Sequence, residues 1–95
     1  MDLVIRGGTV MAGDGPVVTD VGVEDGRIVQ LGGVMSAPDE VDAVGRFVLP
    51  GGVDPHVHLT DPRTGPGIHS WADDFEVGTR AALAGGVTTV GNMSF

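Results

Sequence analysis

Two histidines that stand one residue apart, His56 and His58, carry the clearest chemical signal in this sequence. They fall in a run, residues 53–59, whose other members are apolar except for Asp54; it follows a Pro-Gly-Gly turn, and we predict it to be a β-strand. Side chains alternate along a strand, so both imidazoles and Asp54 point to the same side, with the two histidine Cα atoms about 7 Å apart. Both rings can therefore reach one cation at about 2.0–2.1 Å, the distance typical of zinc. Asp54 can orient a ligand or accept a hydrogen bond from it.

The same pair has a simpler interpretation. A His-x-His pattern is short and arises by chance, and such histidines are commonly surface residues. Position favours a metal site, because the pair lies at the carboxyl end of the first strand of a predicted βα unit, where α/β folds place their sites. Two histidines do not complete a catalytic zinc site, which takes at least three protein ligands. The chain has no cysteine, so we expect the other ligands to be nitrogen or oxygen atoms beyond Phe95.

The elements after the histidine strand must hold it in place. Residues 60–69 form a loop rich in proline and glycine. We predict that a helix then begins with Ser70 as its N-cap and Asp73 as the capping-box partner. Trp71 and Phe75 have helical spacing, which predicts that both pack in the core.

A second strand completes the unit. Gly85 and Gly86 are predicted to end the helix, and residues 87–91 to form a buried strand. Strand, helix and strand within residues 51–95 make one βαβ unit with parallel pairing. Parallel sheets are normally buried on both faces. We therefore expect the chain to be an N-terminal fragment of a larger α/β protein.

Residues 1–50 are predicted to form a separate all-β part. Short apolar runs alternate there with turns rich in glycine, of which the whole chain has 17. Asp25 and Gly26 indicate a two-residue hairpin, because both residue types tolerate positive φ. The expected strands are residues 3–6, 9–11, 17–24, 27–31, 41–44 and 47–49.

Composition narrows the classes of function. The net charge of −8, from 13 acidic and 5 basic residues, repels phosphate backbones and anionic membrane surfaces. We therefore expect no nucleic-acid partner and no membrane partner. No apolar run reaches the roughly 18 residues that a membrane span needs, and no secretory signal is visible at the start of the chain. The expected location is the cytoplasm.

Three segments, in this order, resemble the cyclic amidohydrolase branch of the amidohydrolase superfamily, which contains dihydropyrimidinases, hydantoinases and allantoinases. The first is LVIRGGTV at residues 3–10, together with DGRI at residues 25–28. The second is the histidine strand itself, PGGVDPHVHL, at residues 50–59. The third is DDFEVGTRAALAGGVTTV, at residues 73–90.

The resemblance implies an α/β fold in which a small β-sandwich domain precedes a (β/α)8 barrel of roughly 250 residues or more. Residues 1–50 would be part of the sandwich, and residues 51–95 the first βαβ unit of the barrel. By the same resemblance, His56 and His58 would bind one of two zinc ions that are bridged by a carboxylated lysine. That lysine, two more histidines and the aspartate that acts as general acid/base would all lie outside these residues. This segment would hold no catalytic residue and would be inactive alone.

The implied reaction is metal-dependent hydrolysis of a C–N bond in a cyclic amide or imide, with the metals activating a hydroxide and polarising the ring carbonyl. The implied partners are a cyclic ureide or amide substrate, the remaining barrel segment, and further copies of the chain in a homo-oligomer, a tetramer by resemblance.

Two positions bear on the substrate. Dihydroorotases, which the chain also resembles, carry an arginine two residues after the second histidine, where this chain has Thr60, which cannot form a bidentate ion pair with a carboxylate. The run at residues 92–95, NMSF, also departs from the dihydroorotase pattern. A hydantoin or dihydropyrimidine ring is therefore favoured. Allantoinase or dihydroorotase activity, or a non-catalytic dihydropyrimidinase-like scaffold, are the alternatives. Arg63 is a solvated charge or a second substrate contact in the loop.

Overall fold

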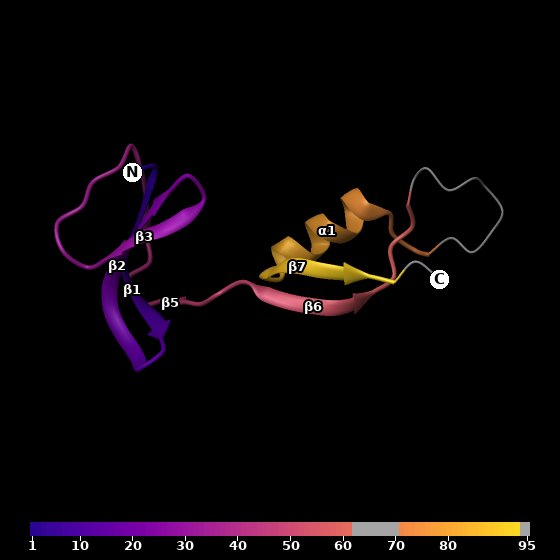
Figure 1. Cartoon of the computed structure of the whole chain (residues 1–95), viewed down its shortest axis with the longest axis horizontal. Helices are drawn as coiled ribbons and strands as arrows, with labels where there is room; N and C mark the ends of the chain where they lie inside the picture. The colour runs from indigo at the N-terminus through magenta and orange to yellow at the C-terminus, as the bar shows by residue number, and fades with distance from the viewer. Residues whose placement is uncertain (62–70, 94–95) are drawn as a thin grey trace. The chain divides into compact units, whose positions relative to one another are not determined.

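The structure is a computed structural model that describes residues 1–61 and 71–93. It divides into two compact units, Met1–Pro50 and Gly51–Phe95. The strands of the first unit are β1 (Leu3–Ala12), β2 (Gly15–Glu24), β3 (Arg27–Leu31), β4 (Asp39–Asp42) and β5 (Phe47–Val48). The second unit contains β6 (Gly52–Val57), α1 (Phe75–Ala84) and β7 (Val87–Asn92) (Figure 1).

The first unit is one sheet built around β1. Its strand order is β3-β2-β1-β4, and β5 also pairs with β1. The pairs β1–β2 and β2–β3 are antiparallel, whereas β4 and β5 run parallel to the first and second halves of β1. The two strands predicted at residues 3–6 and 9–11 are one continuous strand. Gly7, with φ of 68°, forms a bulge that shifts the register between Ile5 and Gly8 without ending the pairing.

The hairpin between β2 and β3 confirms the predicted turn. Asp25 has a φ of 50° and Gly26 a φ of 73°, and such positive values at both turn residues match the right-handed twist of the flanking strands. The prediction for β4 was displaced by two residues, since that strand is Asp39–Asp42 rather than residues 41–44. It ends at Asp42 because that carboxylate accepts the N–H of Val44 at 3.0 Å and turns the chain.

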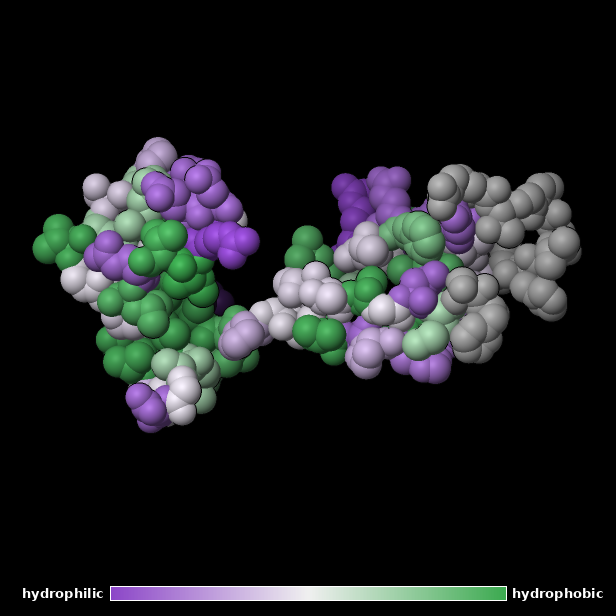
Figure 2. Space-filling view, in the orientation of Figure 1, coloured by the Kyte–Doolittle hydropathy of each residue, from purple (hydrophilic) through white to green (hydrophobic). Residues whose placement is uncertain are grey.

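Few side chains of the first unit are buried. Val4, Val21, Met35 and Ala43 form its core. Larger apolar side chains of the same sheet are open to solvent, among them Val18 and Phe47, whose exposed fractions are 71% and 72%. Figure 2 shows apolar surface over these strands. The described residues thus form one sheet with a thin core, and the second sheet that a sandwich requires stays a prediction.

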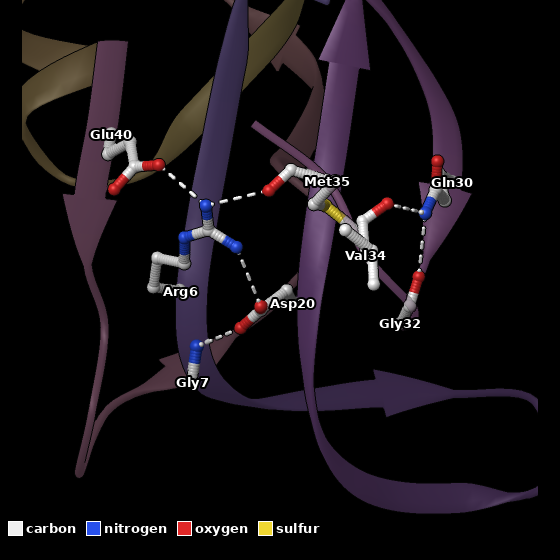
Figure 3. Close-up of polar contacts among 8 residues, drawn as sticks. All are labelled: Arg6, Gly7, Asp20, Gln30, Gly32, Val34, Met35 and Glu40. Carbon is white, nitrogen blue, oxygen red and sulfur yellow. Dashed lines mark hydrogen bonds and ion pairs between the residues drawn. The ribbon is translucent and has the colours of Figure 1, made fainter. Parts of the chain in front are cut away.

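A polar cluster joins three strands of this sheet (Figure 3). The guanidinium of Arg6 on β1 binds Glu40 at 2.6 Å, Asp20 at 3.0 Å and the carbonyl oxygen of Met35 at 2.8 Å. The hydrogen bond to Glu40 and then that to Asp20 raise the pKa of Arg6. Asp20 also accepts the N–H of Gly7 at 2.8 Å. This backbone bond first, and Arg6 second, lower the pKa of the Asp20 carboxyl. The cluster fixes the bulge of β1 against β2.

The second unit is a strand–helix–strand unit in which β6 and β7 pair in parallel, as predicted. The helix α1 contacts β7. Gly78 allows α1 and the end of β6 to approach closely, because a Cβ built there would overlap Cδ2 of Leu59. Gly85 closes the helix with its N–H donating to the carbonyl oxygens of Ala81 and Ala82, and Gly86 continues with a φ of 88°. The predicted C-terminal glycines are confirmed.

The predicted start of this helix is wrong. Asp74 is the N-cap, and its Oδ1 accepts the N–H of Val77 at 2.9 Å. Ser70 lies outside the described residues, and Asp73 precedes the cap instead of lying in the first turn. The helix cannot begin earlier because the Asp73 carbonyl oxygen accepts the N–H of Thr60 at 2.9 Å. Trp71 therefore lies before α1, with 43% of its surface exposed, and not in a helical core position.

Within residues 1–61 and 71–93, no helix is long and apolar enough to cross a membrane.

Candidate metal site

The two imidazoles that the sequence singles out meet at the carboxyl end of β6. Nε2 of His56 lies 3.2 Å from Nε2 of His58. The two ring centroids are 5.0 Å apart, and the ring planes are inclined at 70°. At this separation the two nitrogens can share a proton, or both can bind one cation.

The separation fits a zinc ion. Two nitrogens that each lie about 2.0–2.1 Å from a tetrahedral zinc are about 3.3 Å apart, close to the distance observed here. His56 is exposed and His58 half-buried, so the pair is accessible from outside this unit. The positions of His56 and His58 are therefore compatible with both imidazoles binding the same zinc ion.

Asp54 acts on the backbone of this segment. Its Oδ1 accepts the N–H of His56 at 3.1 Å, two residues further along the strand. The bond closes a local turn around Pro55, where the register of β6 against β7 is irregular. A contact from Asp54 to a metal-bound ring, which the sequence predicts, stays a prediction.

Trp71 stands beside the second histidine. Its ring centroid lies 4.5 Å from that of His58, with the planes inclined at 37°. The backbone of Trp71 is held by Thr60, whose Oγ1 accepts the tryptophan N–H at 2.6 Å and lies 3.3 Å from its carbonyl oxygen. Sequence reasoning assigned Trp71 to the core and therefore missed this contact. The spacing of Trp71 and Phe75 suggested that both belong to one helix, whereas Trp71 lies before α1 and its ring is free to contact His58.

Thr60 and Arg63 were predicted to line a substrate loop. The structure ties Thr60 to the segment before α1 through its side chain and through its backbone N–H. Arg63 lies outside the described residues. A substrate role for either residue stays a prediction.

Asn92, at the end of β7, is a further residue at this end of the unit. Its Oδ1 accepts the N–H of Leu59 at 2.8 Å, across 33 residues of sequence. The sequence shows only an asparagine after an apolar strand, so its partner could not be predicted from its position.

The two histidines alone would not complete a metal site. Within the ranges 1–61 and 71–93, no group of three or more His, Cys, Asp or Glu side chains lies close enough to hold a metal ion. As metal ligands, the two imidazoles would need further ligands from residues elsewhere.

Comparison with known proteins gives the family. No protein-family model matches the chain. A D-hydantoinase from Ralstonia pickettii is 41% identical over 91 residues, which are 95% of this chain and 19% of the relative. An allantoinase from Enterococcus faecalis is 45% identical over 92 residues, which are 97% of this chain and 20% of the relative.

The fold agrees with these relatives. A solved structure of D-hydantoinase superposes with a TM-score of 0.81 at 40% identity, and the match covers 95% of this chain and 19% of that one. The fold and sequence define a member of the cyclic amidohydrolases, and the chain belongs to that family. It spans about a fifth of the length of the curated relatives that it matches.

Proposed function

We propose that the full-length protein containing this chain hydrolyses a C–N bond in a cyclic amide or imide, with His56 and His58 as two ligands of a zinc ion. The observation that carries the proposal is the 3.2 Å separation of the two Nε2 atoms at the end of β6. The similarity to a D-hydantoinase and an allantoinase supports the class of substrate.

The residues of this chain would hold and orient the metal. When bound, the ion would lower the pKa of a water molecule and polarise the substrate carbonyl. Asp54 would fix the backbone of the first ligand, and the ring of Trp71 would limit rotation of the second. A barrel would contribute the remaining ligands, including a carboxylated lysine between two zinc ions, and an aspartate as general acid/base. We also propose that the protein acts in the cytoplasm as a homo-oligomer.

A hydantoin or dihydropyrimidine ring is the proposed substrate. Thr60 supplies no positive charge for a substrate carboxylate, which disfavours dihydroorotate. Allantoin is the second candidate, because an allantoinase is 45% identical to this chain. A non-catalytic scaffold is the alternative to both, and it would need no metal.

The test uses the purified full-length protein, its His56→Ala and His58→Ala variants, and a Glu76→Gln control on the exposed surface of α1. We expect the wild type and the control to carry zinc and to open hydantoin, dihydrouracil or allantoin, and each histidine variant to lose metal and activity by at least about a hundredfold. Metal content would be measured by elemental analysis, and hydrolysis by loss of the ring absorbance. Zinc retained in both histidine variants would refute the assigned ligands. A wild type without metal and without activity on any of these rings would favour the scaffold.

A further inference from the structure

The chain leaves the parallel strand β6 at Val57, directly before the second histidine. The carbonyl oxygen of Val57 accepts the N–H of Met93 at 2.8 Å, which is a backbone bond between the ends of β6 and β7. Thr60, three residues later, donates its N–H to Asp73 in front of α1. Between these two bonds, at His58 and Leu59, the backbone therefore passes from pairing with β7 to pairing with the segment before α1.

Asn92 provides one more bond between β7 and the segment that follows β6. The N–H of Leu59 is met by the side-chain oxygen of Asn92 at 2.8 Å and not by a backbone carbonyl. Leu59 is half-buried, and loss of this acceptor would leave its N–H without the bond that ties it to β7. His58 lies between the Val57 carbonyl and the Leu59 amide, and both of these groups are bonded to the end of β7.

We propose that Asn92 is a positioning residue for the His58 ligand. It touches neither the imidazole nor a substrate, and it acts by fixing the peptide group that follows His58, so that Nε2 stays within reach of the same cation as Nε2 of His56. This inference rests on the proposed metal site. The role requires an oxygen acceptor at the length of an asparagine side chain, which aspartate also supplies and leucine does not.

The experiment measures zinc affinity of the full-length protein by competition with a chromophoric chelator. The variants are Asn92→Leu, which keeps the volume but removes the acceptor, and Asn92→Asp, which keeps the acceptor. Asp74→Ala is the matched control, because it removes a bond of the same kind, from a side-chain oxygen to the N–H of Val77 in the first turn of α1, and leaves the bond between Asn92 and Leu59 in place. Thermal unfolding of each chelator-treated protein gives the change in stability that is independent of metal.

We expect Asn92→Leu to weaken zinc binding by about tenfold or more, Asn92→Asp to restore it to the wild-type level or above, and Asp74→Ala to lower the unfolding temperature with zinc affinity unchanged. Equal zinc affinity in Asn92→Leu and Asp74→Ala would overturn the positioning role, and so would an Asn92→Asp variant as weak as Asn92→Leu. Unchanged zinc binding in His56→Ala would instead refute the metal site itself.

A measurement on the wild type keeps the inference testable if Asn92→Leu does not fold. Hydrogen exchange, followed by mass spectrometry on peptides that cover residues 57–61, reports on the Leu59 amide. We expect a slowly exchanging amide in the chelator-treated protein, because Asn92 and not the metal holds it. Exchange of that amide as fast as in an unstructured peptide would contradict the proposal.

Discussion

Asp20 shows how one side chain can serve both the backbone and another charge. Its Oδ1 accepts the N–H of Gly7, and its Oδ2 pairs with Arg6 at 3.0 Å. Both contacts favour the charged carboxylate and lower the pKa of Asp20 from its ordinary value of 3.8. The stabilisation is therefore fully present above pH 3.8 and is lost as the pH falls through the lower pKa of the folded state.

The first prediction concerns Asp20→Asn. We expect this variant to be less stable than the wild type at pH 6, because the ion pair with Arg6 is lost, and the difference to shrink as the pH falls below 3.8. Urea unfolding followed by circular dichroism at pH 6, 4 and 3 measures it. Asp14→Asn, in the exposed turn between β1 and β2, removes the same charge without these contacts and should show no such dependence. A difference between wild type and Asp20→Asn that does not change with pH would contradict the assigned cause.

At the scale of elements, α1 can lie close to the segment that follows β6 because residue 78 is a glycine and has no side chain. Gly78 lies opposite Leu59, and a Cβ on that glycine would overlap the leucine side chain. Gly85, at the end of the same helix, differs: its φ is −92°, and a Cβ there would be 3.5 Å from the nearest other atom, the Ala82 oxygen. The same substitution should therefore be destabilising at Gly78 and nearly neutral at Gly85.

We predict that Gly78→Ala lowers the free energy of unfolding by about 1 kcal/mol, although alanine favours a helix over glycine by about 0.8–1.0 kcal/mol, because overpacking costs about 1–3 kcal/mol. Gly85→Ala should change it by less than about 0.5 kcal/mol. Denaturant unfolding of both variants gives the comparison. In a Leu59→Ala background, Gly78→Ala should no longer destabilise. A Gly78→Ala variant more stable than the wild type would show that the close contact is unimportant.

Local chemistry made part of this structure predictable. Asp25 and Gly26 specify their turn without help from distant residues, and the apolar strands on either side of a helix indicate parallel pairing. The strand period predicted His56 and His58 on one side, and their Nε2 atoms do meet at 3.2 Å, although β6 ends at Val57 and not at the predicted residue 59. The start of α1 was not predictable in this way, because Ser70, Asp73 and Asp74 are all good N-caps and the choice depends on Asp73 receiving the N–H of Thr60.

Contacts between distant residues could not be read from any pattern. Arg6 finds Asp20 after 14 residues and Glu40 after 34. Leu59 finds Asn92 after 33 residues. Such contacts depend on how the strands pair. In a single sequence each charged or amide side chain has many possible partners, and nothing in the pattern distinguishes among them. The candidate site was therefore predictable in its imidazoles and not in Trp71, whose ring lies beside that of His58, or in Asn92, which binds the N–H of Leu59.

At the scale of the whole molecule, the chain supplies only two of the ligands that the proposed zinc site needs. It spans about a fifth of its curated relatives, and its described residues bring two imidazoles together without a third ligand. A zinc ion with only two protein ligands is bound weakly, because structural and catalytic sites use at least three.

We therefore predict that residues 1–95 produced alone hydrolyse no cyclic amide and bind zinc at least about a hundredfold more weakly than the full-length protein. Chelator competition and a hydantoin assay on both proteins, at equal concentration, measure this. Measurable hydrolysis by residues 1–95 would contradict the proposal that ligands from elsewhere are needed.

The strand order of the first unit also bears on how the protein is made. Every strand pairing described there joins residues between 3 and 48, and the β1–β2 and β2–β3 hairpins each close over two residues. Hairpins form within about 1–10 μs, whereas a ribosome adds about 5–20 residues per second. Pairing in this unit can thus begin before the histidine strand has emerged. His56 and His58 would then be synthesised onto a chain in which strands β1 to β5 can already pair, while β7, the partner of β6, begins only 30 residues after β6 ends.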